Sequence, residues 1–486
     1  MPFVIRTIIL YTIGIEYVGL GGLFGSLINV LNITELGFGG AISYILYKPV
    51  AENDNQKVCA ILNFARKCFW IIGLVVTIIG IVILPFLSFF VHGNYPDNLN
   101  IVLLYMFYLA NSIISYVMFS YKRILFAAVQ RYDIETKISS ITIILQYLLQ
   151  VLVLVIFKNY YVYVLMIPIA TILNNLICGI VTNQKYPHFK ACGHVTKQEI
   201  EIIKQKVGGA FFSKLGATVF LSVDNIIISS FFGLTILGKY SNYYMIITML
   251  LSVFAIIHNT LRPIIGNCIV TDNKEKNYTL LKHLYFIYMW MAAACACFML
   301  CLYQDFISVW SGEQNLLAFN MVILFTIYWY TERVISLPIV YVEAAGYWWE
   351  VRYVTLIEAI VNLTLNITLS KMIGLSGILL STIISVISVA IIGYLRVLFK
   401  KYFGKCKLKD FLKYIFDICI RTICTIAIVW LVIYRVNAFN WEILILKGCV
   451  TAILFIIIGL FLNIKNENAI ESVKFMYQIF VGGKQK

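Results

Sequence analysis

Fourteen apolar runs divide this chain, and they constrain its fold more than any other feature of the sequence. Most of them reach the length of about 20 residues that a helix needs to cross roughly 30 Å of hydrocarbon. Because the runs have the length of helices and not of strands, membrane-spanning helices are expected. The runs cover residues 3–15, 22–47, 63–91, 100–121, 137–157, 160–182, 207–232, 238–262, 283–303, 316–336, 352–370, 375–395, 414–434 and 443–462.

The composition excludes a soluble fold. Hydrophobic residues make up 61% of the 486 residues and charged residues 13%, with a mean hydropathy of +0.88. That much apolar surface cannot be hidden inside a soluble core. The sequence therefore predicts an all-α polytopic membrane protein with about 14 spans. The run at 3–15 is too short to cross and lacks the pattern of a signal peptide, so we expect the first span to be truncated.

The net charge of +15 reflects orientation in the membrane. Thirty of the 38 Lys and Arg residues lie in alternate loops or in the C-terminal tail, and the opposite loops hold four. Basic loops stay on the cytoplasmic side, so these loops and the C-terminus are predicted to be cytoplasmic. This distribution does not indicate a nucleic-acid partner.

No motif in the sequence indicates catalysis. A GxxxxGK[ST] loop and a HExxH motif are both absent, so we expect no ATP-driven pump in this chain, no enzyme activity and no cofactor. The twelve cysteines show no paired spacing that would imply disulfides. Cys295, Cys297 and Cys301 share one run, but no His lies at ligand spacing, so helix packing is favoured over a metal site.

An internal repeat organises the chain. Short motifs recur at a nearly constant separation, from 214 residues early in the chain to 217 or 218 later. The matched pairs are Gly19-Leu20 with Gly233-Leu234, Lys48-Pro49 with Arg262-Pro263, Asp54-Asn55 with Asp272-Asn273, Asn98-Leu99 with Asn315-Leu316, and Ala127-Ala128 with Ala344-Ala345. Both halves start in the same sense, so the repeat predicts two six-helix bundles related by a pseudo-two-fold axis along the membrane normal, with a central cavity between them.

Four regions follow from this repeat. We expect an N-terminal bundle at 1–182, a cytoplasmic amphipathic connector at 183–206, and a C-terminal bundle at 207–395. Residues 396–486 are expected to form two extra transmembrane helices and a cytoplasmic tail.

A set of short runs extends over both halves of the chain. Those in the first half are Ile5-Arg6-Thr7, Gly14–Leu20, Glu35–Gly39, and Leu46–Pro49 followed by Glu52, Asn53 and Asp54. Those in the second half are Val223–Ile228 and Gly238–Tyr243. Together these runs resemble the polysaccharide-transporter branch of the multidrug, oligosaccharidyl-lipid and polysaccharide exporter superfamily, the Wzx-type flippases. The resemblance covers nearly the whole chain.

The resemblance implies a function and a location. It implies a multi-pass protein of the bacterial inner membrane that moves undecaprenyl-pyrophosphate-linked oligosaccharide units to the outer leaflet for capsule, O-antigen or exopolysaccharide synthesis. The expected partners are the lipid-linked oligosaccharide, membrane lipids, a polysaccharide polymerase and the chain-length machinery. A MATE-like exporter of small cations and a membrane polysaccharide polymerase are the alternatives.

Basic residues inside the apolar runs are the candidates for holding a pyrophosphate. Arg6 and Lys214 lie in the first runs of the two halves, where an unpaired charge is costly. A structural pair of Arg6 with Glu35 is an equally weighted alternative. Lys48 and Arg262 occupy equivalent repeat positions and could flank the cytoplasmic mouth, although anchoring at the lipid headgroups explains them too.

Acidic residues inside the runs are the candidates for ion coupling. Asp224 and Glu35 could exchange a proton or a sodium ion, and a hydrogen-bonded helix contact is the alternative for Asp224. The adjacent pair Glu332-Arg333 is expected to neutralise itself near the cytoplasmic face. Arg421 lies outside the repeated core and is the weakest candidate.

Overall fold

The computed structural model describes residues 2–32, 38–92 and 99–482, with side chains except at residues 41, 198, 199, 202, 204–217, 219–221 and 476–482. The regular secondary structure in these ranges is helical throughout, as the sequence predicts. The helices group into two compact units, Met1–Gly238 (unit 1) and Lys239–Lys486 (unit 2). The predicted division into four regions remains a prediction.

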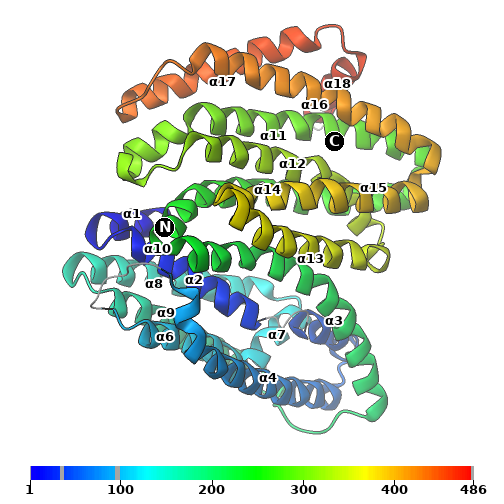
Figure 1. The fold of residues 1–486 in the computed structure, drawn as a ribbon. Coiled ribbons are helices and arrows are strands. Elements are labelled where there is room, and N and C mark those ends of the chain that lie inside the picture. Colours follow the sequence, from blue (N-terminus) through cyan, green and yellow to red (C-terminus); the bar gives the residue numbers. More distant parts are fainter. Residues whose placement is uncertain (1, 33–37, 93–98, 483–486) are drawn as a thin grey trace. The chain divides into compact units, whose positions relative to one another are not determined.

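Unit 1 is built from antiparallel helices that follow one another along the chain (Figure 1). Within it α4 packs on α6, α6 on α9 and α8 on α9. Close approach of α4 and α6 depends on Gly80, which is covered by Leu109 and whose carbonyl accepts a hydrogen bond from Tyr105 at 3.1 Å. The helices are α1 (Pro2–Thr12), α2 (Ile15–Leu31), α3 (Phe38–Ala51), α4 (Asn55–Ile83), α5 (Leu87–Phe90), α6 (Ile101–Val117), α7 (Ser120–Ala128), α8 (Tyr132–Ile156), α9 (Tyr160–Lys185) and the first part of α10 (Lys197–Thr271).

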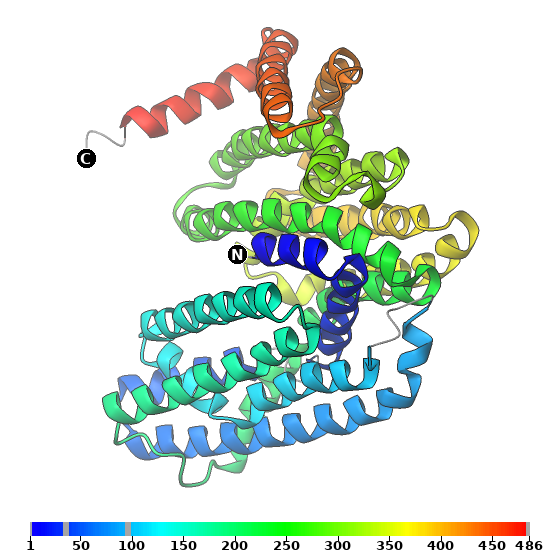
Figure 2. The same cartoon turned by 90° about the vertical axis from the view of Figure 1, so that its left-hand side faces the viewer.

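Unit 2 is arranged around α11. This helix packs against α12, α16, α17 and α18, and its small residues Ala292, Ala293 and Ala296 are fully buried there. Figure 1 shows α16 and α17 beside α11, and Figure 2 shows α18 turning away from the end of α17. After α10 the helices are α11 (Lys274–Ser311), α12 (Phe319–Ala344), α13 (Trp348–Ile373), α14 (Ser376–Ser385), α15 (Ile392–Leu398), α16 (Lys405–Ile433), α17 (Trp441–Asn463) and α18 (Glu467–Gly482).

The helices are those of a multi-pass membrane protein. In the described part of the chain, nine helices are long and apolar enough to cross a membrane, or ten if the bent pair α6 and α7 forms one span. One of the nine, Ser222–Thr271, contains the predicted run 238–262 and the end of the run 207–232, and it is interrupted at Gly233 by a backbone φ of 84° and ψ of 174°. The helices α1 and α2 are apolar but shorter. A total of fourteen spans remains a prediction.

Some helix boundaries recur at about the spacing of the predicted repeat, while the pseudo-two-fold axis and the central cavity remain predictions. The helix α8 begins at Tyr132 and α13 at Trp348, a separation of 216 residues, while α7 ends at Ala128 and α12 at Ala344, again 216 apart. Asp54 caps α4 and Asn273 caps α11, each accepting a backbone hydrogen bond from three residues on. These caps are 219 residues apart, so the matched dipeptides at 54 and 272 are out of register by one residue.

Two prolines close to the predicted run ends at 47 and 262 lie inside helices. Pro49 is followed by two more residues of α3, and α10 continues past Pro263 to Thr271. Each proline removes one backbone donor, and the helix continues beyond it.

Candidate functional site

Arg6 lies on α1 beside a group of tyrosines from α9. Ile5 and Ile9, four residues apart, bury one face of α1 against Val18 of α2 and Leu154 of α8. The next position, Arg6, is partly buried and lies within electrostatic reach of the hydroxyl groups of Tyr160 and Tyr163. The sequence places a guanidinium in an apolar helix, and the fold brings the hydroxyl groups of two tyrosines near it.

The tyrosines form one connected cluster, which we call the Arg6–tyrosine cluster (Arg6, Tyr17, Tyr160 and Tyr163). The rings of Tyr17 and Tyr160 meet edge to face with centroids 4.9 Å apart, and those of Tyr160 and Tyr163 stack at 5.3 Å. The Tyr160 hydroxyl donates to the Tyr17 carbonyl at 3.0 Å. Gly21 keeps room for it, since a Cβ there would lie 3.3 Å from that hydroxyl. Such a cluster offers a cation for an anionic group and rings that can stack on a sugar.

Two predicted site residues lie outside the described side chains. Glu35 lies outside the described residues, and the side chain of Lys214 on α10 does as well. The expected pair of Arg6 with Glu35 is therefore untested, and so is a substrate contact by Lys214.

The repeat-equivalent cations Lys48 and Arg262 have different partners. Lys48 pairs with Glu52 one turn further on at 3.8 Å, and its side chain is 82% exposed. Arg262 on α10, whose side chain is 45% exposed, binds the carboxylate of Glu343 on α12. An exposed pair within one helix contributes little to stability, whereas the Arg262 pair joins two helices of unit 2.

Asp224 lies on the part of α10 that packs antiparallel against α2. Its neighbour Asn225 donates to the Ser26 hydroxyl at 2.9 Å, and Thr235 donates to the Glu16 carboxylate at 3.1 Å. Between these contacts the two backbones come so close that a Cβ on Gly19 would overlap the Leu234 carbonyl oxygen. Asp224 itself is partly buried, beside this small-residue crossing.

Arg333 is the charged residue whose surroundings sequence reasoning did not anticipate. Its side chain is 7% exposed, and Glu332 is 3.6 Å away, in agreement with the expected neighbouring pair. The guanidinium also lies 4.9 Å from the ring centroid of Trp329, and its Nε has no hydrogen-bond partner in the described part of the chain. A basic residue inside an apolar run is the sequence signal for such a group, and Trp329 lies four residues earlier on the same helix, at the spacing that brings two side chains together.

A second buried group in unit 2 joins α13 to α14. The Asn362 amide donates to the Thr382 hydroxyl at 3.1 Å, and the Asn366 amide donates to the Asn362 side-chain oxygen at 3.1 Å. Ser381 donates to Asn366. Since these buried groups satisfy one another, the network fixes the packing of the two helices.

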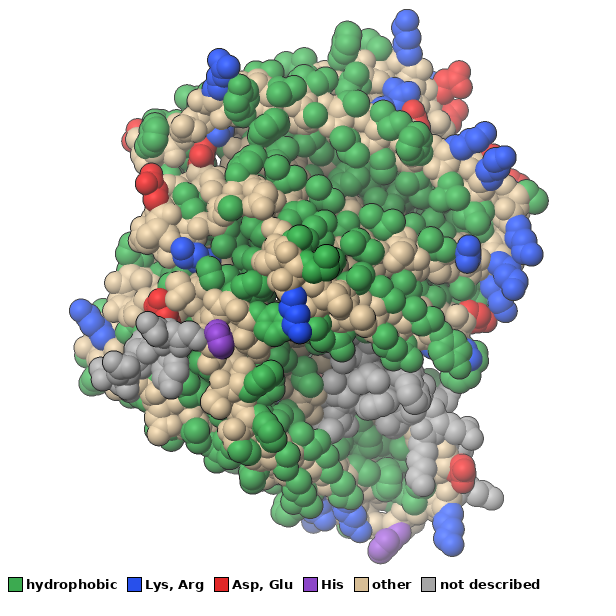
Figure 3. All heavy atoms as spheres, viewed as in Figure 1, with side chains coloured by type: hydrophobic (Ala, Val, Ile, Leu, Met, Phe, Trp, Pro, Cys, Tyr) green, Lys and Arg blue, Asp and Glu red, His purple; other side chains and the backbone are tan. Residues whose placement is uncertain are grey.

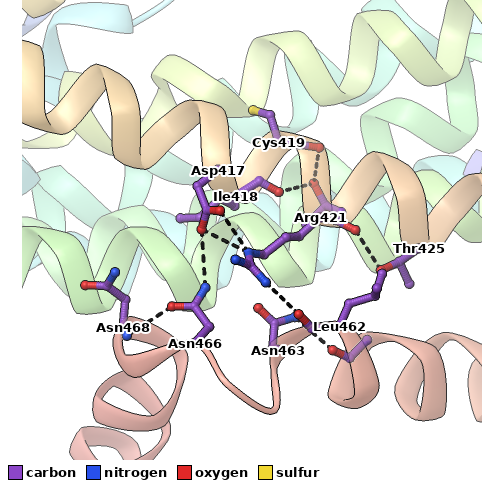
Figure 4. A network of polar contacts seen from close by, with 11 residues as sticks. Asp417, Ile418, Cys419, Arg421, Thr425, Leu462, Asn463, Asn466 and Asn468 are labelled. Atoms are coloured by element: carbon purple, nitrogen blue, oxygen red, sulfur yellow. Dashed lines mark hydrogen bonds and ion pairs between the residues drawn. The ribbon is translucent and has the colours of Figure 1, made fainter.

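Arg421 belongs to a network in the C-terminal region (Figure 4). Its Nε donates to both carboxylate oxygens of Asp417 at 3.0 Å, and its Nη1 donates to the Leu462 carbonyl at 2.6 Å. Asn466 also donates to Asp417, at 3.3 Å. The network joins α16 to the end of α17, which explains Arg421 without a substrate.

Metal binding finds no support in the described side chains. Among them, no group of three or more His, Cys, Asp or Glu residues is arranged to hold a metal ion. Cys297 and Cys301 are buried in the packed face of α11.

Comparison with known proteins identifies the family and the fold. The model of the polysaccharide biosynthesis protein family matches residues 1–268, more than half of the chain. A comparison with curated proteins found no significant match.

Among solved structures, lipid II flippase MurJ in an inward closed conformation is 15% identical with a TM-score of 0.64 and covers 95% of this chain and 97% of its own. An inward-facing multidrug resistance MATE family transporter of the MOP superfamily is 13% identical with a TM-score of 0.64, over 85% of this chain and 95% of its own. A MATE protein in the bent conformation is also 13% identical, with a TM-score of 0.53, and the match covers 85% of this chain and 92% of that protein. The chain therefore belongs to the polysaccharide biosynthesis protein family and has the MATE and MurJ fold.

Proposed function

We propose that this protein is a flippase that moves undecaprenyl-pyrophosphate-linked oligosaccharide units across the bacterial inner membrane by alternating access. The observation that carries the proposal is the family match over residues 1–268, together with a fold similar over 95% of the chain to that of a lipid II flippase. The transported units would serve capsule, O-antigen or exopolysaccharide synthesis. The C-terminus would be cytoplasmic, as the distribution of Lys and Arg predicts.

The Arg6–tyrosine cluster supports an anionic, sugar-bearing substrate. A pyrophosphate inside a membrane protein needs cationic partners, and the fork of a guanidinium suits phosphate oxygens. Arg6 supplies such a fork beside Tyr160 and Tyr163. Lys214, Lys48 and Arg262 are proposed as further contacts along the route of the headgroup.

Ion coupling is proposed as the energy source. The sequence carries no nucleotide-binding loop of the GxxxxGK[ST] type, and we therefore propose that an ion gradient across the membrane drives transport. Asp224 and Glu35 are the proposed coupling residues, because carboxylates inside apolar helices are costly and bind protons or cations. A polysaccharide polymerase and the chain-length machinery are the proposed partners downstream.

A MATE-like exporter of small cations is the second candidate. The MATE structure and MurJ have the same TM-score of 0.64 to this chain, so the fold does not separate the two functions. Family membership and the position of Arg6 favour the flippase, since a guanidinium repels a cationic substrate.

Deletion of the gene, followed by analysis of lipid-linked oligosaccharide in each leaflet, separates the candidates. A flippase predicts accumulation on the cytoplasmic side. Accumulation of single units on the outer side would indicate a polymerase, and unchanged lipid-linked pools with altered drug susceptibility would indicate a cation exporter.

A variant series tests the residues. Arg6→Gln should reduce surface polysaccharide about tenfold or more at unchanged protein level, since a hydrogen bond to a charged group contributes about 1.5–3 kcal/mol. Arg435→Gln is the matched control, because Arg435 is exposed and donates to the neighbouring Tyr434 hydroxyl at 2.8 Å. Normal polysaccharide in Arg6→Gln would remove Arg6 from the mechanism.

A further inference from the structure

An exposed group of aromatic and basic side chains lies at the start of α13. Trp348, Trp349 and Tyr353 are 49%, 65% and 57% exposed, and Arg352 lies among them. The residues are spaced at i, i+1, i+4 and i+5, so they share one side of the helix. We call these four residues the α13 aromatic–arginine patch.

Arg352 is held in place by its neighbours. Its guanidinium carbon lies 3.8 Å from the ring centroid of Trp349 and 4.3 Å from that of Tyr353. Its Nη1 donates to the Trp349 carbonyl. A guanidinium that is already fixed between two rings has little conformational freedom left to lose when it binds a ligand. Its other N–H groups can donate to a phosphate oxygen.

A basic segment lies beside the start of α13. Lys401 pairs with Glu350 of α13 at 3.5 Å, and the Tyr347 hydroxyl donates to the Lys401 carbonyl at 3.5 Å, so residues 399–403 lie beside the start of α13. The neighbouring Lys400 is exposed. Residues 396–413 hold seven Lys and Arg residues. Figure 3 shows Lys and Arg side chains gathered at the end of unit 2 where α15 meets α16.

The remainder of α13 places the patch at the level of lipid headgroups. The helix is one of the candidate membrane spans, and Ile357, Ile360, Leu363 and Ile367 form an exposed apolar stripe at helical spacing beyond Tyr353. The exposed hydroxyl groups of Thr364 and Thr368 beside this stripe donate to carbonyl groups of the same helix. A stripe of this kind faces lipid tails, so the patch at its end lies where tails give way to headgroups. Trp and Tyr are enriched at that boundary, and Arg is attracted to anionic lipid there.

We infer that the α13 aromatic–arginine patch, with Lys400 and Lys401, is a binding site for the phosphate headgroup of an anionic phospholipid. The occupant is a lipid and not a second copy of the chain, because a cationic, aromatic end on an apolar lipid-facing stripe is complementary to an anionic amphiphile. The inference is independent of the proposed flippase activity.

Native mass spectrometry of the full-length purified protein tests the inference by titrating phosphatidylglycerol against phosphatidylcholine. Arg352→Gln should weaken phosphatidylglycerol binding about fivefold, and Arg352→Gln with Lys400→Gln and Lys401→Gln about a hundredfold, because each cation near the surface contributes a similar increment. Phosphatidylcholine binding should stay unchanged. Arg352→Lys should keep part of the selectivity, since it keeps the charge and loses the planar stacking.

Arg435→Gln is again the matched control, since its guanidinium lies 5.5 Å from the centroid of an exposed tyrosine ring but belongs to a loop poor in basic residues. Unfolding curves of each variant confirm that the protein is intact. Equal phosphatidylglycerol binding by folded wild type and folded triple variant overturns the inference. It is also overturned if both lipids weaken equally, or if the variants change only the oligomeric state.

Discussion

Lys447 and Asp305 form a buried ion pair that joins α17 to α11 within unit 2. The Nζ of Lys447 on α17 lies 2.7 Å from Oδ2 of Asp305 on α11, and the side chains are 5% and 16% exposed. The same oxygen accepts the backbone N–H of Ala438 at 3.2 Å. At an effective dielectric constant of about 20 the Coulomb attraction at this distance is about 6 kcal/mol. Desolvation of two ions costs several kcal/mol each, so the net contribution of the pair is small.

Removing one partner should be far more damaging than removing both. Lys447→Met leaves the Asp305 carboxylate buried with one backbone donor, and should lower the free energy of unfolding by about 3–5 kcal/mol. Asp305→Leu should do the same by leaving the ammonium buried. The double variant Lys447→Met with Asp305→Leu should recover to within about 1–2 kcal/mol of wild type, because neither charge is then buried.

Equilibrium unfolding in mixed detergent and SDS micelles measures all four proteins in one double-mutant cycle. Two results would refute the reasoning. Single variants as stable as wild type would mean that the pair is not buried from water. A double variant as unstable as the singles would mean that side-chain packing, and not unpaired charge, sets the cost.

Three further predictions concern packing, the C-terminal network and topology. Gly19→Ala should lower the free energy of unfolding by about 1–3 kcal/mol, because the added Cβ overpacks the crossing of α2 and α10. In the same SDS unfolding assay Gly25→Ala should be neutral, because a Cβ there would meet nothing within 4 Å. Arg421→Gln should cost about 1 kcal/mol or less and leave surface polysaccharide normal, because its ion pair is partly exposed; loss of polysaccharide would give Arg421 a role in transport. Reporter fusions after Asn98 and after Lys407 should report outside and inside respectively, and the reverse would overturn the predicted orientation.

The apolar runs and the distribution of charge were sufficient to predict an all-α membrane protein. Each segment that crosses the membrane must itself be long enough and must satisfy its own backbone hydrogen bonds, so both requirements can be recognised in the sequence of that segment. Shared motifs also indicated the repeat. The residue-by-residue alignment of the two halves was less accurate. The matched dipeptides align Asp54 with Asp272, whereas the helix cap equivalent to Asp54 is Asn273, because a dipeptide match does not specify which residue caps the helix. The runs 207–232 and 238–262 predicted a break after residue 232, and the structure narrows it to the backbone angles of Gly233.

The surroundings of the charged residues depend on tertiary structure. The sequence indicates that Arg6 and Arg333 are costly in apolar helices, but the tyrosines beside Arg6 come from a helix more than 150 residues away. The packing of Arg333 on Trp329 is local, at i and i+4, and helical spacing could have revealed it. The same spacing relates Trp349 to Tyr353, so the α13 aromatic–arginine patch was also accessible to sequence reasoning.

Transbilayer movement in proteoliposomes tests the central claim most directly. Purified protein is reconstituted with undecaprenyl-pyrophosphate-linked oligosaccharide under an ion gradient, and the fraction of oligosaccharide open to an added impermeant glycosidase is followed over time. Without protein, about the half that lies in the outer leaflet should be cleaved; with wild type, cleavage should approach completion, and with Arg6→Gln it should stay near half. Cleavage that remains near half with active, folded wild-type protein under every gradient tested would contradict the account.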